Sequence, residues 1–455
     1  MRVATRVFSG ESLLARALRS SALTVAGFGG SQILRLASNL ILTRLLFPEA
    51  FGIMAIVNVV IQGLMQFSDV GVGPAIMQSK RGDDPAFLDT AWTIQVLRGV
   101  ALFFTACALA WPLAWFYEEP LLLQLLPVAG IGLLIAGFNP TALDTAKRHL
   151  RWGRLTSIEF TVQITGIVAG VALAWWLKSV WALIIANVIS TGIALALHWL
   201  ALPGARNRFG WERPALRELV NFGQWIFLST ICGFLFNQAD KLILGKYLSF
   251  EVFGVYNIGF FLASFPMLLG NMFTWRLLIP IYRELPPSES PQNFAKLRRM
   301  RFAVTTGLIA LTAGFALCGV WLIALMYDDR YAMAGAVVVV MATMQIPQII
   351  VMTYDQASLA AGDSKRFFVL TLAKAVAMIA ALLLGLTWGG LLGALLSYGA
   401  AMLVAYPMVI WLARRMRAWD PLHDAVMAGL GLGVAALAFW INRTAIADLA
   451  ALSGW

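Results

Sequence analysis

ASNLILTRLLFPEAFG, residues 37–52, is repeated 202 residues later as ADKLILGKYLSFEVFG, residues 239–254. Eight of the sixteen positions are identical, and the basic residue Arg44 is matched by Lys246. Each copy predicts the end of an apolar helix, a short turn with an acidic residue, and Phe-Gly at the start of another apolar helix. A period near half of the 455-residue chain predicts two similar helical bundles fused head to tail, an organisation common among transporters.

The composition of the whole chain agrees with this pattern. Hydrophobic residues make up 60% of the sequence and charged residues 13%, whereas charged residues approach about a quarter of a soluble domain. An ordinary soluble domain is therefore excluded. The net charge of +11 does not favour a nucleic-acid-binding protein, because most of the charge lies in short loops on one side. Cys107, Cys232 and Cys318 lie far apart in apolar runs, so we expect small buried residues, not disulfides or zinc ligands.

Apolar segments long enough to cross a bilayer follow one another almost from end to end. A span needs about 20 mostly apolar residues. This criterion predicts an all-α polytopic membrane protein with thirteen spans, at 20–46, 50–78, 88–116, 120–143, 155–177, 180–202, 219–246, 251–281, 301–327, 331–361, 366–386, 390–413 and 422–441.

The loop charges predict the orientation. The N-terminus and the loops after even-numbered spans hold 24 lysines and arginines, against 5 in the other loops. By the positive-inside rule the N-terminus is cytoplasmic and the C-terminus lies outside. The first apolar run contains Arg35 and lacks a small-residue cleavage site, so we expect an uncleaved span and no signal peptide.

The same pattern predicts the domain organisation. We expect two lobes of six helices, a linker between them, and one additional helix. The segments are a cytoplasmic N-terminal segment 1–19, an N-lobe 20–202, a cytoplasmic linker 203–218, a C-lobe 219–413, and a C-terminal helix and tail 414–455.

Signals for catalysis and cofactors are absent from the sequence. It has no phosphate-binding G-x-x-x-x-G-K-[S/T] loop and no H-E-x-x-H motif, and His149, His198 and His423 are scattered. The predicted outer loops are a few residues long and leave no room for an external catalytic domain. We therefore expect no enzyme, no cofactor and no metal.

Polar residues within the spans fall on helical stripes. Asn58, Gln62, Gln66 and Asp69 share one face of the second span, because they recur at helical spacing. Similar stripes include Asn39 in the first span and Gln163 in the fifth. Small-residue and amide packing between helices accounts for an isolated stripe. Several stripes that also include charges favour a water-filled interior cavity.

Charged residues deep in the spans are the candidate functional residues. Arg35 and Arg98 lie about 15 Å into their helices, at about 1.5 Å per residue, too deep for easy snorkelling. Each either lines the cavity and meets an anion, or pairs with a carboxylate such as Asp69, Glu159 or Asp89. Lys241, Arg276 and Lys374 lie nearer span ends, where snorkelling accounts for them.

Four acidic residues are candidates for a coupling cation or proton. They are Asp69, Glu159, Asp240 and Asp355. For Asp240 and Asp355, pairing with Lys241 or a nearby amide is the alternative.

Three motifs resemble the Wzx-like polysaccharide-biosynthesis flippases, a family of the multidrug/oligosaccharidyl-lipid/polysaccharide exporter superfamily. They are the repeated basic-turn-Phe-Gly segments at 40–52 and 240–254, the Gly-rich DVGVGPA at 69–75, and QASLAAGDSK at 356–365. The resemblance covers nearly the whole chain in layout. Thirteen spans differ from the family's usual twelve or fourteen.

The resemblance implies a fold and a function. The fold would be two six-helix lobes around a central, partly cationic cavity. The cargo would be an undecaprenyl-pyrophosphate-linked oligosaccharide, moved across the bacterial inner membrane by alternating access for surface polysaccharide synthesis. Partners would be this lipid-linked substrate, the bilayer, and a polysaccharide polymerase with its chain-length machinery.

Three alternative functions remain open. A cation-coupled multidrug exporter or a lipid II flippase of the same superfamily would share the fold. A polytopic polysaccharide polymerase or ligase would be an enzyme, but such enzymes usually carry a large external loop.

Overall fold

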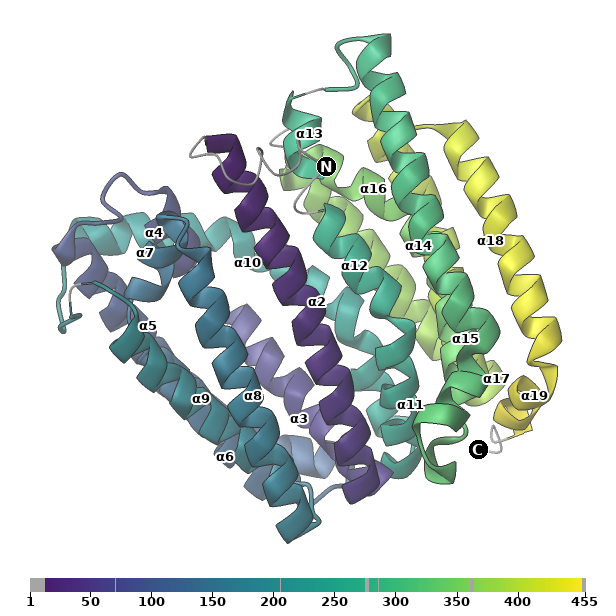
Figure 1. Ribbon diagram of the computed structural model, residues 1–455, viewed down its shortest axis with the longest axis horizontal. Coiled ribbons are helices and arrows are strands. Elements are labelled where there is room, and N and C mark those ends of the chain that lie inside the picture. The colour runs from purple at the N-terminus through teal and green to yellow at the C-terminus, as the bar shows by residue number, and fades with distance from the viewer. Residues whose placement is uncertain are drawn as a thin grey trace, which may run out of the picture. The chain divides into compact units, whose positions relative to one another are not determined.

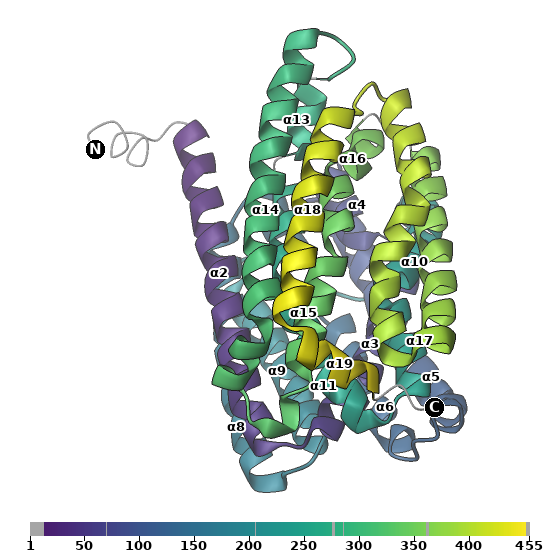
Figure 2. The same ribbon diagram turned by 90° about the vertical axis from the view of Figure 1, so that its right-hand side faces the viewer.

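The computed structural model describes residues 13–69, 71–204, 206–274, 278–284, 286–360 and 364–451. Every regular element in these ranges is helical, which confirms the predicted fold class (Figures 1 and 2). The chain divides into two compact units, Met1–Phe227 and Leu228–Trp455, and the division falls within α10.

The first unit holds the helices up to the first part of α10. They are α2 (Leu13–Leu45), α3 (Pro48–Phe67), α4 (Val72–Gln78), α5 (Pro85–Tyr117), α6 (Leu122–Gly137), α7 (Ala142–Arg148), α8 (Trp152–Leu177), α9 (Trp181–Ala201) and α10 (Arg213–Tyr247). Helix α5 packs along α6, and α8 packs between α2 and α9 (Figure 1). The α5–α6 contact is close because Gly99 and Gly137 face each other, and a Cβ on Gly99 would lie 2.9 Å from the Gly137 Cα.

The second unit holds the remaining helices. They are α11 (Phe250–Ala263), α12 (Phe265–Phe273), α13 (Ile279–Glu284), α14 (Pro291–Met326), the 3₁₀ turn η2 (Asp329–Tyr331), α15 (Ala334–Met344), α16 (Ile346–Ala360), α17 (Ser364–Arg415), α18 (Pro421–Ile441) and α19 (Arg443–Ala451). Helix α15 is the centre of this unit, since each of its residues from Ala334 to Thr343 is buried. It packs against α11, α14 and α17.

The repeated sequence forms the same local structure in both units. Helix α2 ends at Leu45 and α3 begins at Pro48, while α10 ends at Tyr247 and α11 begins at Phe250. Both helix breaks are thus 202 residues apart, as in the sequence repeat. In each copy the glutamate lies in the first turn of the following helix, where its charge favours the positive end of the helix dipole.

The structure contains fewer helices that meet the criteria for a membrane span than the thirteen spans that the sequence predicts. In the described part of the chain, eight helices are long and apolar enough to cross a membrane, or ten if each of two bent pairs is one span. Helices α2 and α10 have 33 and 35 residues but are less apolar than the others, since they carry polar stripes. The total of thirteen therefore stays a prediction.

Helix α17 counts once among the eight, yet it contains two of the predicted spans. Its 52 residues would extend about 78 Å if straight, more than twice the roughly 30 Å hydrocarbon core. The backbone leaves the helical region at Gly389 and Gly390. Gly385 and Gly393 then lie in backbone contact. The helix is therefore a hairpin of two antiparallel arms (Figure 2).

Four predicted spans are interrupted. The span at 120–143 breaks between Gly137, where α6 ends, and Ala142, where α7 begins, with a bend of 61°. The span at 50–78 breaks after Phe67, where α3 ends, and resumes in α4 after Gly71, whose φ is 70°. The span at 251–281 breaks at Ser264, with Pro266 in the first turn of α12. The span at 331–361 begins with η2 and breaks again between α15 and α16. The length criterion missed these breaks because only one to four residues separate the helices, too few to interrupt an apolar segment of about 20 residues.

The cysteines are free thiols and only one of them is buried. Cys232 is buried, Cys107 is half-buried and Cys318 is exposed. The expectation of burial was wrong for Cys318, because an apolar residue on a membrane-length helix such as α14 needs lipid around it, not protein.

Candidate functional site

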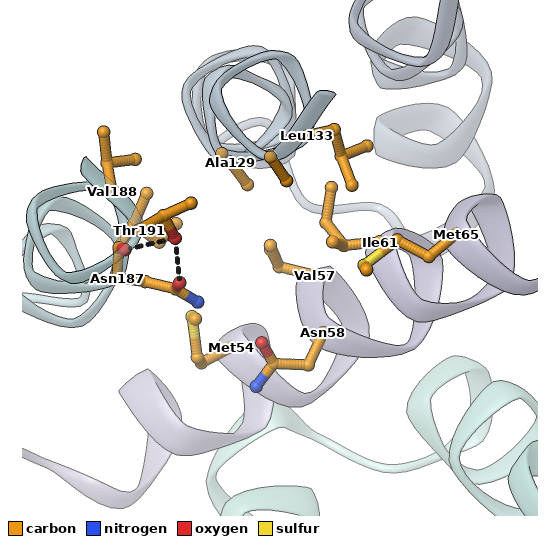
Figure 3. A pocket seen from close by; sticks show the side chains of 13 residues that line it. Met54, Val57, Asn58, Ile61, Met65, Ala129, Leu133, Asn187, Val188 and Thr191 are labelled. Carbon is orange, nitrogen blue, oxygen red and sulfur yellow. Dashed lines mark hydrogen bonds between the residues drawn. The ribbon is translucent and has the colours of Figure 1, made fainter. Parts of the chain in front are cut away.

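A cavity of about 260 Å³ lies within the first unit, between α3, α6 and α9 (Figure 3). Most of its lining is aliphatic. Its polar groups are Asn58 on α3, and Asn187 and Thr191 on α9. The Thr191 hydroxyl donates to the Asn187 carbonyl oxygen at 2.9 Å. An apolar pocket with a few convergent polar groups is the usual form of a ligand site.

The polar stripe of α3 leads to this cavity. Asn58, Gln62 and Asp69 are exposed, whereas Ile53, Ile56 and Val57 are buried. These three residues of the stripe are therefore not packed against other helices, and a stripe that faces a shared interior cavity stays a prediction. Only Asn58 among its members lines the cavity.

Arg98 reaches the C-terminal end of α3 from α5. Its Nε donates to the Ser68 hydroxyl at 2.8 Å, and a terminal nitrogen donates to the Met65 carbonyl. Another terminal nitrogen lies 3.9 Å from Asp69 Oδ1, which also accepts from the Gly71 N–H at 2.9 Å. Arg98 thus stabilises the last carbonyls of a helix, where a cation is favourable. This is the structural pairing with Asp69 that the sequence left open.

Gln163 fastens two helices together. It accepts from the Ser31 hydroxyl at 2.7 Å and donates to the Ser31 carbonyl at 2.8 Å, which joins α8 to α2. Nearby on the same helices, Arg35 and Glu159 are exposed and Asn39 is half-buried.

Asp240 is the most buried of the three candidate acids whose side chains the structure describes. It is 1% exposed on α10, and its Oδ2 accepts from the Tyr256 hydroxyl of α11 at 2.6 Å. Its Oδ1 meets no hydrogen-bond geometry with the described residues, although the buried Tyr398 side chain also interacts with this carboxylate. Lys241 instead donates to Gln238 Oε1 at 2.7 Å and lies 4.8 Å from the centre of the Phe260 ring. Asp240 is therefore hydrogen-bonded to Tyr256 and not paired with Lys241, the alternative that the sequence suggested.

Three further candidates differ in how the structure places them. Lys374, on the first arm of α17, is 5% exposed. The expectation of snorkelling was wrong for it, because neighbouring helices enclose the position. Arg276 and the side chain of Asp355 lie outside the described residues. Within the first unit, Arg98 and Asp69 lie together at the end of α3, whereas Gln163 lies at the contact of α8 with α2.

Sequence analysis missed a buried polar network in the second unit. Arg301 is fully buried and lies ten residues into α14, which begins at Pro291, whereas the predicted span begins at residue 301. Its guanidinium donates to the Ala418 carbonyl at 2.5 Å and to the Tyr282 hydroxyl. It also lies 4.4 Å from the centre of the Tyr354 ring.

The network continues into the first turn of α18. Asp424 accepts from the hydroxyls of Tyr354 and Tyr406, each at 2.7 Å, and His423 Nδ1 lies 3.0 Å from it. Asp420 accepts twice from Arg298, at 2.5 and 2.9 Å. These contacts anchor the additional C-terminal helix to α14 and α16. The sequence does contain a local signal for the start of α18, because Asp followed by Pro, at 420–421, is typical of the first residues of a helix.

Comparison with known proteins gives one family match. A sequence model of the family described as polysaccharide biosynthesis protein matches residues 41–335. The chain is 20% identical over 307 residues to a teichuronic acid biosynthesis protein of Bacillus subtilis, covering 66% of this chain and 62% of the relative. It is 22% identical over 385 residues to a succinoglycan biosynthesis transport protein of Rhizobium meliloti, covering 82% and 76%. The first four curated relatives are matched over only 51% to 62% of their own length.

Solved structures show the same fold. A lipid II flippase in an inward closed conformation matches with a TM-score of 0.70 at 14% identity, over 93% of both chains. An inward-facing multidrug resistance transporter of the MATE family matches with a TM-score of 0.64 at 15% identity, over 85% of this chain and 95% of that one. At such identities the similarity is one of fold.

Proposed function

The chain belongs to the polysaccharide biosynthesis protein family, and on that premise we propose that it flips an undecaprenyl-pyrophosphate-linked oligosaccharide across the bacterial inner membrane. The observation that carries this proposal is the family match over residues 41–335 on a chain that shares its fold with a lipid II flippase over 93% of its length. The glycan would serve surface polysaccharide synthesis, with a polymerase and chain-length machinery downstream.

The transport step follows from solvation. Sugar hydroxyls and a pyrophosphate cannot cross hydrocarbon unaided, because buried polar groups lose their water partners. A protein interior with polar and cationic side chains replaces that water, while the polyprenyl tail stays in lipid. Alternating access by rocking of the two lobes then moves the headgroup with no covalent step.

The polar groups of the first unit support a headgroup site there. Asn58, Asn187 and Thr191 offer amide and hydroxyl groups to a sugar at the cavity. Arg35 is exposed on α2 and fits a pyrophosphate through charge-assisted hydrogen bonds. Arg98 would join this site only on leaving the end of α3. Asn39, Gln62, Lys241, Arg276 and Lys374 remain candidates for contacts with the substrate.

Asp240 is the coupling-ion site that we favour among the four acids. Its Oδ1 meets no hydrogen-bond geometry with the described residues, and the Tyr256 oxygen lies beside the carboxylate. The described residues form no group of three metal-binding side chains. A monovalent cation or a proton therefore suits this position better than a divalent metal.

Exchanging Asp240 for asparagine separates coupling from folding. The amide oxygen of the Asp240→Asn protein can still accept from Tyr256, so we expect the melting temperature in detergent to change by only a few degrees. Flipping in proteoliposomes should lose most of its dependence on an applied ion gradient. Unchanged gradient dependence in the Asp240→Asn protein would contradict this assignment.

Deleting the gene tests the function as a whole. Lipid-linked oligosaccharide should accumulate on the inner leaflet and surface polysaccharide should fall, while sensitivity to cationic dyes stays unchanged. Raised dye sensitivity with normal surface glycan would instead identify a multidrug exporter. Rescue of a strain that lacks its lipid II flippase would identify that activity.

A further inference from the structure

The segment at residues 206–213, which we call the strap, leads into the first residue of α10 and is held along the first turns of α5. Its backbone N–H groups donate at every second residue. Arg208 donates to Asp89 Oδ1 at 2.9 Å, Gly210 to the Thr93 hydroxyl at 3.0 Å, and Glu212 to the Thr90 hydroxyl at 3.1 Å. This spacing of two is that of an extended chain. The strap is therefore a fixed part of the first unit.

Side-chain contacts hold both ends of the strap. Asn207 accepts from the Thr141 N–H at 3.0 Å and donates to the Thr141 hydroxyl at 2.8 Å. Glu212 pairs with Arg81 at 2.7 Å, and Arg81 also pairs with Asp84. The hydrogen bonds that Arg81 donates to Glu212 and Asp84 raise its pKa above the ordinary value. The one acid of the strap is thus already neutralised within the protein.

The outward side chains of the strap are basic and aromatic. Phe209 is 68% exposed and Trp211 57% exposed, and Arg206, Arg208 and Arg213 are also exposed. None of these three arginines forms an ion pair with a carboxylate in the part of the chain that the structure describes. A rigid backbone therefore presents three uncompensated cations and two large rings at one place.

The helix beside the strap sets its depth in the membrane. Helix α5 has 33 residues and extends about 50 Å, so when it is centred upright on the roughly 30 Å hydrocarbon core it projects about 10 Å at each end. Thr93, the deepest strap contact, lies eight residues into α5, about 12 Å from its start. The strap is therefore level with the lipid headgroups, where aromatic rings and arginines are favourable.

We propose that the strap is a binding surface for anionic phospholipid headgroups. Phe209 and Trp211 enter the boundary between headgroups and acyl chains, and the arginines bind the phosphates of the same lipids. Helix α10 starts at Arg213, so the bound lipids fix the depth at which the chain leaves the first unit. This proposal rests only on the chain being a membrane protein and is independent of the transported substrate.

Lipid photo-crosslinking tests this proposal on the full-length protein in nanodiscs. Phosphatidylglycerol and phosphatidylcholine probes, supplied at equal mole fraction, are mapped onto peptides by mass spectrometry. We expect the anionic probe to label residues 206–213 at least about fivefold more than the zwitterionic probe, the ratio that one arginine supplies near an anionic surface. Raising KCl should lower this ratio, because salt screens exposed charges.

Two triple variants separate a strap effect from a loss of net charge. Arg206→Gln/Arg208→Gln/Arg213→Gln should bring the two probes to equal labelling. Arg151→Gln/Arg154→Gln/Arg299→Gln removes three other exposed arginines and should keep the native ratio. Equal labelling of the native strap by both probes, or the same loss in both variants, would overturn the proposal. So would displacement of the probe by undecaprenyl pyrophosphate but not by unlabelled phosphatidylglycerol, which would make the strap a substrate contact.

Discussion

At the scale of single residues, the role of a charged side chain within a membrane span can be assigned only once its contacts are known. Arg35 and Arg98 are equivalent in the sequence, yet Arg35 is exposed and Arg98 holds the end of α3. Burial of a charge is tolerated where hydrogen bonds replace water. The two arginines should therefore respond differently to removal.

Arg98→Ala should lower both stability and transport. It leaves the Met65 carbonyl and Asp69 without their cation, at a cost of about 1–3 kcal/mol for the lost charged hydrogen bonds. Arg35→Ala should abolish flipping, and Arg35→Lys should keep part of it, because a point cation replaces a bidentate fork. Melting in detergent beside flipping in cells measures both. Arg44→Ala, an exposed arginine on the same helix as Arg35, is the control. Normal flipping by stable Arg35→Ala protein would remove this residue from the mechanism.

Asp420 should make stability dependent on pH. Burial alone would raise the pKa of Asp420, but hydrogen bonds from Arg298 and from the His423 N–H leave it below its ordinary value. A depressed pKa contributes stability above the unfolded-state value, about 3.9, and that stability is lost as the pH falls through the folded-state value. Asp420→Asn should therefore melt earlier than the native protein at pH 7, by the equivalent of about 1–3 kcal/mol. The difference should shrink below about pH 4. A constant difference between pH 7 and about pH 3.5 would contradict this.

At the scale of elements, glycines permit contacts that a side chain would prevent. The α17 hairpin turns at two glycines, of which only Gly390 has a positive φ, 53° with ψ −140°. Its neighbour Gly389 has φ −141°, which other residues adopt, and a Cβ there would meet open space. The two positions therefore form a matched pair.

Gly390→Ala should destabilise the protein by about 1–3 kcal/mol, because an L residue is strained in that backbone region. Gly389→Ala should be near neutral. The measurement is the melting temperature of the two purified variants in the same detergent. Equal effects at both positions would show that the turn does not depend on the left-handed conformation.

At the scale of the whole molecule, fold is retained where sequence is not. The chain shares 14% identity with a lipid II flippase over 93% of both chains, at a TM-score of 0.70. The bilayer explains this, since lipid-facing positions accept any apolar residue while backbone hydrogen bonding still requires helices. The orientation of such a chain is decided instead by its loop charges.

Reporter fusions test the orientation directly. Fusions after Pro48, Glu118 and Trp388 should be external, and fusions after Gly82, Gly153 and Pro214 cytoplasmic. The reason is the asymmetry of 24 basic residues against 5 between the two sets of loops. A cytoplasmic signal at Glu118 would contradict the span assignment.

The amino-acid sequence by itself determined the membrane class, the helical fold, the family and the paired helix breaks 202 residues apart. These properties depend on composition and on periodicity within one helix, which are local. Only the tertiary structure decided that Gln163 bonds to Ser31, 132 residues away, that Asp240 bonds to Tyr256, and that Arg301 is buried. Such partners depend on which helices pack side by side and at which rotation. In a chain with 60% hydrophobic residues, many helix faces are apolar enough to pack, so the choice among them is not visible in any single helix.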